Sequence, residues 1–423
     1  MEIRKKQAER VTEYLLSRHA EGPRFDPLPR VLSGDAFTHL EQGLIQRINA
    51  LNLFLNDIYG HRMILRDGII PEEFVYSSPA YRTACVSASP IKRIYTHLSA
   101  TDLICEGDGT WYAVEDDLLT PSDCVYPHLA RKLCRAEAPE QYEMDTLCDN
   151  CGLDILLNQL YSDLRDGLEN ASEGIVVILD QSGAEEPTFQ ASYLAEITGA
   201  VVARPGELTV MDDAVYYRGA EKGGFQKVAV IHRLEPDGLL DPLCMGGDYR
   251  RGVPHLMEAY RRGRVAIVNA PGCGIACDRG LYYFVPDMIR YYLLEEPIIP
   301  NVPTLLPWKK DDREQIMDDL RNLILINVSA EGKGSVVAGG RLTTSERDRL
   351  GAAILANPRR YVAQTMLHPS PLTRLDQGGA ATEDTEACFR ALTVCSNSTR
   401  VWMGGSTQFL SAGVFQDTWI LSE

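Results

Sequence analysis

The stretch TDLICEGDGTWYAVEDD, residues 101–117, predicts a β-hairpin that brings three acidic side chains together. Asp108-Gly109 is a signal for a two-residue hairpin turn, because both central positions of that turn require a positive φ. Counting back from this loop sets Asp102 opposite Glu115. Asp117 lies two residues beyond Glu115 and therefore shares its face of the sheet. The stretch predicts that these three acids converge at one end of the hairpin.

This convergence indicates a metal site. Like charges directly opposite each other destabilise a sheet, and a bound cation removes that penalty. Carboxylate oxygens are the ligands that Mg²⁺ prefers, and the ion typically bridges them to substrate phosphates. Spacing alone leaves an alternative, a solvated hairpin end with three free acids. A register slip of one residue would also separate the facing pair.

The bulk composition limits the class of protein. A chain of 423 residues is long enough for two or three domains, and 45% apolar with 24% charged residues is typical of a globular protein. The formal net charge of −17 argues against nucleic acid as a partner, since phosphate binding needs a basic surface. A nucleotide is still compatible with this charge if it binds at a local basic patch or through Mg²⁺.

No stretch has the pattern of a membrane span. The longest apolar runs, such as Gly174–Leu179 and Leu323–Val328, are strand-sized, whereas a spanning helix needs about 20 apolar residues. The opening MEIRKKQAERVTEYLL is charged and helix-patterned, so it is not a secretory signal. We therefore expect a cytoplasmic protein that does not bind membranes.

The cysteines agree with that expectation. The chain has eleven of them without regular spacing, which indicates a reducing compartment and mostly structural thiols. Cys148 with Cys151 and Cys273 with Cys277 leave a tetrahedral zinc site open as an alternative.

The pattern of elements divides the chain into three regions, and the predicted fold class is α/β with α+β parts. Residues 1–145 are predicted as helices followed by the hairpin. Residues 146–305 alternate short apolar strands with helices, which favours a largely parallel sheet. Residues 306–423 follow the proline-rich PIIPNVPTLLP and mix helices with strands. They include a helix with Thr344 or Ser345 as its N-cap.

Ordered motifs run along nearly the whole chain. EDDLLTPS, residues 115–122, is similar to EDN-x-x-TPS of the circularly permuted ATP-grasp family, which is related to the glutathionylspermidine synthetase-like ligases. Further segments that resemble this family are FDPLPR (25–30), EQGLIQRINALNLFLNDIYG (41–60), RDGIIPEEFVYSSP (66–79), VIHRLEPDGLLDP (230–242), RGVPHLMEAYRRGRVAIVNAPGCG (251–274), FVPDMIRYYLLEEPIIPNVPT (284–304), YVAQ (361–364) and DTWIL (417–421). The order of so many segments makes the resemblance specific.

The resemblance implies an ATP-grasp fold whose halves are exchanged in chain order. Its members are expected to use ATP and Mg²⁺ to join a carboxylate to an amine through an acyl phosphate, with Mg²⁺ offsetting charge on the phosphates. Carried over by motif, Asp102, Glu115 and Asp117 are the metal ligands. The family has Asn at the position of Asp117, and either residue offers an oxygen. The three regions become a helical N-terminal region with the metal-binding half (1–145), a central pre-ATP-grasp-like α/β domain (146–305) and the nucleotide-binding half (306–423).

The nucleotide-binding half departs from the family pattern. LILINVSAEGKGS, residues 323–335, stands where the family reads LVVKP-x-x-G-x-GG-x-G. The nucleotide-contacting lysine falls on Ile326, and only Gly332 and Gly334 remain of a loop that lets backbone N–H groups approach phosphates. Lys333 offers a charge from the loop itself.

Further site residues follow from the same resemblance. Gln364, in YVAQ, is expected to contact the nucleotide. Arg390 is kept in EACFRAL, although the acid of that motif is replaced by Cys388, and Arg279 stands at the lysine of the family's DDK. Arg233 ends a strand of the α/β region, and its planar fork suits an anionic substrate group. We expect Arg233, Arg279 and Arg390 to be the catalytic arginines.

Two functions fit these observations. One is an ATP- and Mg²⁺-dependent ligase acting on a small-molecule carboxylate and amine. The other is a catalytically degenerate ATP-grasp relative that serves as a binding or partner subunit. A homo-oligomer and a paralogous ATP-grasp partner are both compatible with the sequence.

Overall fold

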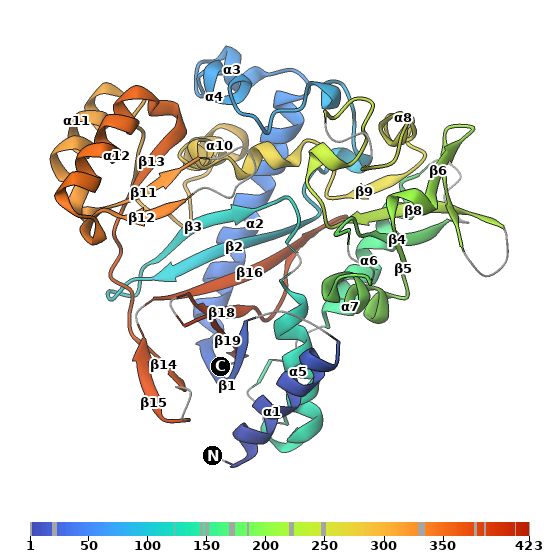
Figure 1. Cartoon of the computed structure of the whole chain (residues 1–423), viewed down its shortest axis with the longest axis horizontal. Helices are drawn as coiled ribbons and strands as arrows, with labels where there is room; N and C mark the ends of the chain where they lie inside the picture. Colours follow the sequence, from blue (N-terminus) through green and yellow to red (C-terminus); the bar gives the residue numbers. More distant parts are fainter. Residues whose placement is uncertain are drawn as a thin grey trace.

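The computed structural model describes the chain apart from residues 1, 19–22, 122, 144–146, 149–151, 169–173, 184–185, 220–223, 247–250, 329–334, 376–378, 385, 411 and 423. Three groups of elements surround one central sheet (Figure 1). The predicted α/β class with α+β parts is confirmed.

The central sheet joins both ends of the chain. Its order is β1-β19-β18-β16-β2-β3, with β17 paired to β16, and β1 runs parallel to β19. The strands are β1 (Arg24–Ser33), β2 (Leu98–Cys105), β3 (Trp111–Asp117), β16 (Ala387–Cys395), β17 (Thr399–Val401), β18 (Ser406–Phe409) and β19 (Val414–Leu421). The hairpin β2–β3 therefore lies at one edge and is held to the rest of the sheet by β16.

Helices cover the two faces of this sheet. The long α2 (Gly34–Ile58) begins with the Ser33 hydroxyl as its N-cap, and it packs Phe37 and Leu40 against Leu103 and Phe389 of the sheet. The opposite side packs against α1 (Glu2–Ser17), α5 (Val125–Glu137) and α6 (Leu153–Asp166). Burial of apolar side chains on both faces makes the sheet the rigid support of the hairpin.

The central region of the chain forms a second sheet, of order β5-β4-β8-β7-β6 with β9 paired to β8. Its strands are β4 (Ile175–Leu179), β5 (Val201–Ala203), β6 (Leu208–Met211), β7 (Ala214–Arg218), β8 (Phe225–Arg233) and β9 (Ala266–Val268), and its helices are α7 (Phe189–Thr198) and α8 (Leu256–Arg261). The pairs β4–β5, β4–β8 and β8–β9 are parallel, which confirms the predicted parallel sheet. An antiparallel extension of β6 and β7 was not predicted.

A third sheet, of order β10-β13-β11-β12, carries the region expected to bind the nucleotide. Its strands are β10 (Thr304–Leu305), β11 (Leu323–Asn327), β12 (Val336–Ala338) and β13 (Tyr361–Thr365), and it packs against α11 (Lys310–Asp319) and α12 (Thr344–Ala356). The N-cap of α12 is Thr343 rather than Thr344 or Ser345, because Thr343 and Glu346 form a reciprocal capping box.

Shorter elements complete the chain. They are α3 (Met63–Arg66), α4 (Glu72–Tyr76), α9 (Arg279–Tyr282), α10 (Val285–Leu293), β14 (Leu372–Leu375) and β15 (Ala381–Asp384). The three-region division at residues 145 and 305 stays a prediction. The C-terminal region supplies strands both to the third sheet and to the central sheet of the hairpin.

Candidate active site

The hairpin turn differs from the predicted one. The loop has three residues, Gly107 to Gly109, because the Glu106 N–H donates to the Thr110 carbonyl at 2.8 Å and the Gly109 N–H donates to the Glu106 carbonyl at 2.9 Å. Within this loop only Gly109 has a positive φ, of 90°. Asp108 instead accepts the Thr110 N–H through its side chain at 2.8 Å. A three-residue loop shifts the register by one residue relative to a two-residue turn.

A β-bulge then restores the predicted pairing. Leu103 lies opposite Ala113, the register shifts at the next position, and Asp102 lies opposite Glu115. The extra residue, Val114, gives its carbonyl to Arg279 at 2.9 Å, while the Ala113 N–H donates to the Pro300 carbonyl at 2.9 Å. At the bulge, backbone groups of β3 therefore form hydrogen bonds with residues outside β2.

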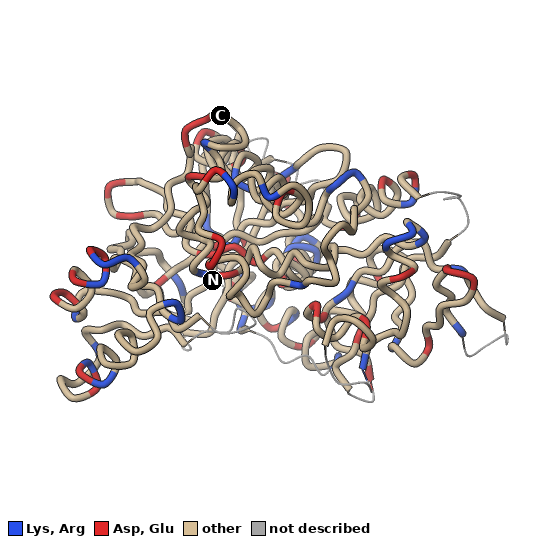
Figure 2. The backbone as a smooth tube through the Cα atoms, turned by 90° about the horizontal axis from the view of Figure 1, so that it is seen from above, with Lys and Arg blue, Asp and Glu red and all other residues tan. Residues whose placement is uncertain are grey.

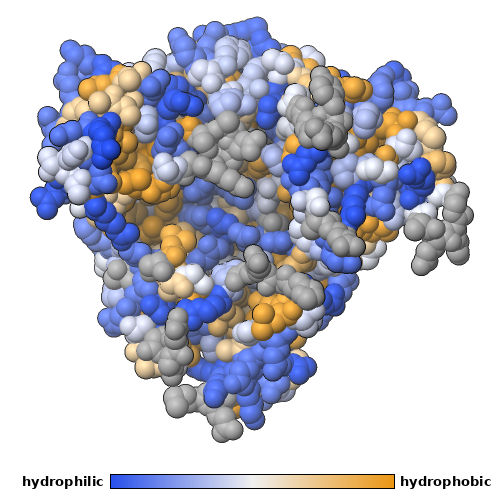
Figure 3. All heavy atoms as spheres, viewed as in Figure 1, coloured by the Kyte–Doolittle hydropathy of each residue, from blue (hydrophilic) through white to orange (hydrophobic). Residues whose placement is uncertain are grey.

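A cavity of about 360 Å³ opens beside the end of the hairpin. Its walls are the ends of β3 and β8, the segment that leads into α9, the stretch after α4, and the strands β11 and β12. In Figure 3 the molecule is hollowed between the lobe of β11 and α12 and the central sheet, with hydrophobic atoms on the lobe and hydrophilic atoms below. A cavity of this size suits a small molecule.

Two of the three predicted metal ligands are paired with arginines. Arg390 binds Asp102 through two parallel hydrogen bonds of 2.7 and 2.8 Å and reaches Asp123 at 2.7 Å. Arg279 lies 3.2 Å from a Glu115 oxygen. Burial raises the pKa of Glu115, and the charge of Arg279 partly offsets that rise. These guanidinium groups neutralise acids that would otherwise repel each other.

Asp117 has no ion pair among the described residues. It accepts the backbone N–H groups of Leu119 at 3.1 Å and Thr120 at 3.3 Å. Burial raises the pKa of Asp117, and the two backbone hydrogen bonds act against that rise. This carboxylate is the one in the cleft that would gain most from an added cation.

The neighbouring Asp116 faces away from the cleft acids. It accepts two hydrogen bonds of 2.9 Å from Arg47 Nε, one of 2.6 Å from Arg47 Nη2 and one of 2.9 Å from the Thr101 hydroxyl. Only 1% of the Arg47 side chain and 3% of the Asp116 side chain are exposed. This pair ties the end of β3 to α2.

The metal site stays a prediction. The three acids share one face of the hairpin, and oxygen donors of this kind fit Mg²⁺. Within the described part of the chain, however, no group of three or more His, Cys, Asp or Glu side chains is positioned to hold a metal ion. Asp102 and Glu115 are each paired with an arginine instead.

The alternative of a zinc site finds no support among the cysteines that are described. Cys151 lies outside the described residues. Cys273 is buried against Arg233 at 3.2 Å, and Cys277 accepts the Leu118 N–H at 3.3 Å. Burial raises the pKa of both Cys273 and Cys277, which disfavours the thiolate that zinc requires.

The structure brings Arg279 and Arg390 to the cleft but not Arg233. The Arg233 side chain is fully buried, lies 2.8 Å from Asp237 and donates to the backbone carbonyls of Asn269 (2.8 Å) and Glu235 (3.1 Å). We expected it to contact an anionic substrate group. Its contacts instead fix the turn after β8 to the end of β9.

The region expected to bind the nucleotide presents apolar side chains to the cavity. Ile326, at the position of the expected lysine, pairs with Val336 across β11 and β12, and both side chains line the cavity. Gln364 is buried on β13 and donates to the Thr304 hydroxyl at 3.4 Å, and it is not among the residues that line the cavity. Gly332, Lys333 and Gly334 lie outside the described residues.

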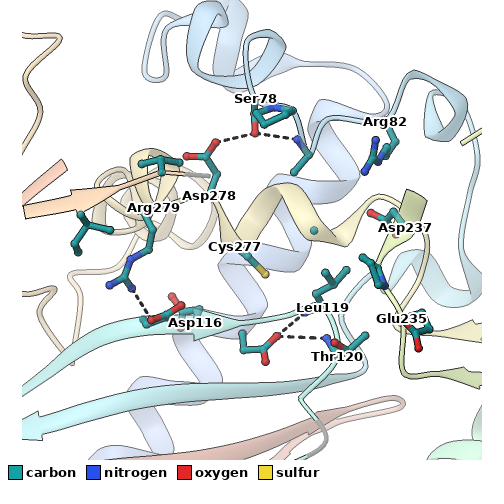
Figure 4. Close-up of a pocket in the computed structure, with 18 of the residues that line it drawn as sticks. Ser78, Arg82, Asp116, Leu119, Thr120, Glu235, Asp237, Cys277, Asp278 and Arg279 are labelled. Carbon is teal, nitrogen blue, oxygen red and sulfur yellow. Dashed lines mark hydrogen bonds and ion pairs between the residues drawn. The ribbon is translucent and has the colours of Figure 1, made fainter. Parts of the chain in front are cut away.

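Sequence reasoning missed a second charged cluster in the cleft. Asp278 accepts the Ser78 hydroxyl at 2.7 Å (Figure 4). It also pairs with Arg359 at 2.9 Å and caps α9 by accepting the Gly280 N–H at 2.8 Å. Arg359 also donates to the Phe74 carbonyl at 2.9 Å and lies over the Phe74 ring. The Asp-Arg pair 278–279 was visible in the sequence, but its partners came from distant segments.

The sequence of this chain matches a known protein family. A family model described as circularly permuted ATP-grasp type 2 matches residues 29–409. The chain belongs to this family. An uncharacterized protein of Synechocystis is 35% identical over 351 residues, which cover 83% of this chain and 72% of that protein. An uncharacterized protein of Mycobacterium tuberculosis is 32% identical over 411 residues, or 94% of this chain and 73% of that protein.

Two further likenesses concern ligases and the fold. A protein of Frankia casuarinae named putative glutamate–cysteine ligase is 32% identical over 352 residues, which are 82% of this chain but 40% of that protein. A glutathione synthetase-like effector from Globodera pallida, solved in its apo form, has a TM-score of 0.57 at 10% identity and covers 99% of this chain and 96% of that structure. The latter supports the ATP-grasp fold over the full length.

Two surface properties complete the description. In Figure 2 acidic and basic residues are interspersed, and no continuous basic stripe is visible in that view. No helix in the described ranges is both long and apolar enough to cross a lipid bilayer.

Proposed function

We propose that this ATP-grasp protein is an ATP- and Mg²⁺-dependent ligase that joins a small-molecule carboxylate to an amine. The observation that carries the proposal is the meeting of the hairpin acids Glu115 and Asp117 with Arg279 and Arg390 in one cavity. Membership of the ligase family supports it.

The residues present fit a metal ion in their chemistry. Glu115 and Asp117 offer carboxylate oxygens on one face of the strand, and burial raises the pKa of each, so a cation is favoured there. When bound, Mg²⁺ would offset negative charge on a nucleotide. Arg279 and Arg390 hold the side chains of Glu115 and Asp102 in place, and their donors are suited to an acid substrate.

The residues that face a nucleotide fit less well. Ile326 and Val336 offer apolar contact but no charge, and the glycine-rich loop lies outside the described residues. No step of the reaction is therefore assigned to these strands.

Measurement of ADP release tests the proposal. The protein is incubated with ATP, Mg²⁺ and pairs drawn from a panel of carboxylates and amines, and ATP affinity is measured by calorimetry in parallel. We expect turnover that depends on one acid and one amine and that is lost in Glu115→Ala. No detectable ATP binding in the presence of Mg²⁺ would sink the proposal.

One observation favours a second candidate, a non-catalytic binding or partner subunit. Ile326 replaces the expected lysine and faces the cavity, while Glu115, Asp102 and Asp278 are each neutralised by an arginine of the same chain. Co-purification with an intact paralogous ATP-grasp protein, together with no ADP release by this chain alone, would support this candidate. A turnover abolished by Glu115→Ala would exclude it.

A further inference from the structure

The charged side chains that line the cavity are almost all paired within the protein. The acid–guanidinium pairs of the lining are Glu115 with Arg279, Asp116 with Arg47, Asp237 with Arg233, Asp278 with Arg359, and Asp102 and Asp123 with Arg390. Each of these acids therefore already has a charge partner within the chain.

Arg82 is the exception among the arginines that line the cavity. No ion pair or side-chain hydrogen bond joins its guanidinium to another residue of the described chain, and its Nε is buried without a partner. Arg233 already lies 2.8 Å from Asp237, the acid that Figure 4 shows on the same side of the cavity as Arg82. A buried donor without an acceptor is costly, and Arg82, unlike Arg62 and Arg359 with the same unpartnered Nε, also lines the cavity, where a ligand can supply the acceptor.

The backbone at Arg82 is held rigidly. Its N–H donates to the Tyr59 hydroxyl at 3.3 Å, and that hydroxyl donates to the Gly272 carbonyl at 3.0 Å. Tyr59 is buried and stacks on Tyr81 with ring centroids 5.3 Å apart. Gly272 has a φ of 92°, and a Cβ there would lie 2.9 Å from the Tyr59 ring. Arg82 is therefore presented to the cavity from a preorganised support.

Arg82 lies on a different side of the cavity from the strands β11 and β12. Figure 4 shows Arg82 and Asp237 across the cavity from Arg279 and Asp116, and an orange strand of the nucleotide-binding half lies on the side of Arg279. A group bound at Arg82 is thus remote from the end of the cavity where the hairpin acids meet Arg279.

We propose that Arg82 is the anion-binding residue of this cleft and that it holds a carboxylate of the small-molecule substrate. The proposal rests on the ligase function given above and deepens it. The substrate then carries an anionic group in addition to the group that reacts, as in a dicarboxylate or an amino acid. The guanidinium fork matches a carboxylate through two parallel hydrogen bonds. A nucleotide phosphate has the same anion chemistry, so the experiment must distinguish the two.

Calorimetry on the whole chain tests the assignment without turnover. The probes are succinate, glutamate and Mg²⁺·ADP, titrated separately into the wild type, Arg82→Ala, Arg82→Lys and Arg62→Ala. Arg62 is a matched control, because its Nε is also buried without a partner, yet it lies over the Tyr76 ring and is not among the residues that line the cavity. Thermal unfolding verifies that each variant is folded.

We expect the wild type to bind succinate or glutamate. Arg82→Ala should weaken that binding by about tenfold to a hundredfold, the usual range for loss of a charged hydrogen bond. Arg82→Lys should bind with intermediate affinity, and added methylguanidinium should restore part of the affinity of Arg82→Ala. Arg62→Ala, and ADP affinity in all variants, should stay within about twofold of wild type.

Three results would overturn the assignment. They are no binding of either carboxylate by the wild type, equal carboxylate affinity in Arg82→Ala, and a loss of ADP affinity in place of carboxylate affinity, which would make Arg82 a phosphate contact. Failure of the ligase proposal is separate, since it appears as missing ADP release while the carboxylate titrations still respond to Arg82→Ala.

Discussion

The hairpin wall and the β11–β12 wall of the cleft carry charge in opposite ways. The hairpin wall carries Asp102, Glu115 and Asp117 on one face, and guanidinium groups from elsewhere in the chain neutralise the first two. The β11–β12 wall faces the same cavity with Ile326 and Val336. One wall therefore stores charge in pairs that a ligand or metal can exchange, while the other offers only apolar contact.

The two walls are stabilised by different interactions. A buried ion pair survives only when hydrogen bonds satisfy both partners, so the hairpin wall depends on distant segments for its stability. The β11–β12 wall is stabilised by apolar packing. Its stability therefore does not depend on the charged lysine that the family pattern has at the position of Ile326.

Arg47→Ala should destabilise the protein by removing the buried ion pair that holds the end of β3 to α2. The change leaves Asp116 buried with the Thr101 hydroxyl as its remaining side-chain donor, and such uncompensated charge destabilises by about 3–5 kcal/mol. The free energy of unfolding in urea measures the effect. The exposed Arg290, paired with Asp287 and Glu296, is the control, and Arg290→Ala should change the free energy by less than about 1 kcal/mol. Equal losses in the two variants would show that burial of the pair does not matter.

Arg390→Ala should weaken the same wall by a smaller amount. The side chain is 21% exposed and donates to both Asp102 and Asp123, so water replaces part of what is lost. We expect about 1.5–3 kcal/mol of destabilisation, the range of charged hydrogen bonds. Arg390→Lys should recover only part of this, because an ammonium group lacks the planar fork. Full recovery by lysine would contradict the two-bond geometry.

Ile326→Lys should give the apolar wall the charge that the family pattern carries. Ile326 is only 2% exposed but borders the cavity, so the flexible stem of a lysine can carry its ammonium group toward a bound phosphate. We expect about tenfold tighter binding of Mg²⁺·ATP by calorimetry, equivalent to about 1.4 kcal/mol. Leu325→Lys, placed on the opposite face within the core beneath α11, should instead destabilise the protein without tightening binding. Unchanged ATP affinity in Ile326→Lys would show that the missing lysine is not what limits nucleotide binding.

Asp117→Asn should make the protein slightly more stable at neutral pH. Burial raises the folded-state pKa of Asp117 above its unfolded value. The folded wild type is therefore most stable when Asp117 is protonated, and it loses stability as the pH rises through the folded pKa. The asparagine variant does not ionise. Its advantage should be a few tenths of a kcal/mol to about 1 kcal/mol at pH 7 and should vanish below about pH 4. Chemical unfolding at both pH values measures it, and an advantage that grows on acidification would contradict the assigned direction.

The sequence predicted the strand pairing of the hairpin correctly but predicted the wrong turn. It predicted Asp102 opposite Glu115 from a two-residue turn, and the register is correct. The turn has three residues instead, and the bulge at Val114 compensates for the added one. Local turn chemistry indicated where the strands reverse. The bulge depends on contacts of Ala113 and Val114 with residues 300–302 and α9, which no local pattern contains.

The roles of the arginines were less predictable. Arg233, Arg279 and Arg390 were all expected at the reacting centre, yet Arg233 is enclosed by backbone carbonyls and Asp237. Arg82 carried no motif that distinguished it, and it was singled out only because its Nε has no partner among the described residues and its side chain lines the cavity. Whether an arginine is free or paired depends on neighbours that the sequence does not place.

The sequence by itself determined the family, the alternation of strands and helices, and the face that Glu115 and Asp117 share. These properties follow from backbone periodicity and from ordered motifs, both of which are local. Tertiary structure alone decided which charges meet, since Arg390 lies 288 residues from Asp102 and reaches it through the pairing of β16 with β2. Electrostatic interactions depend on distance in space and on burial, and a linear sequence specifies neither.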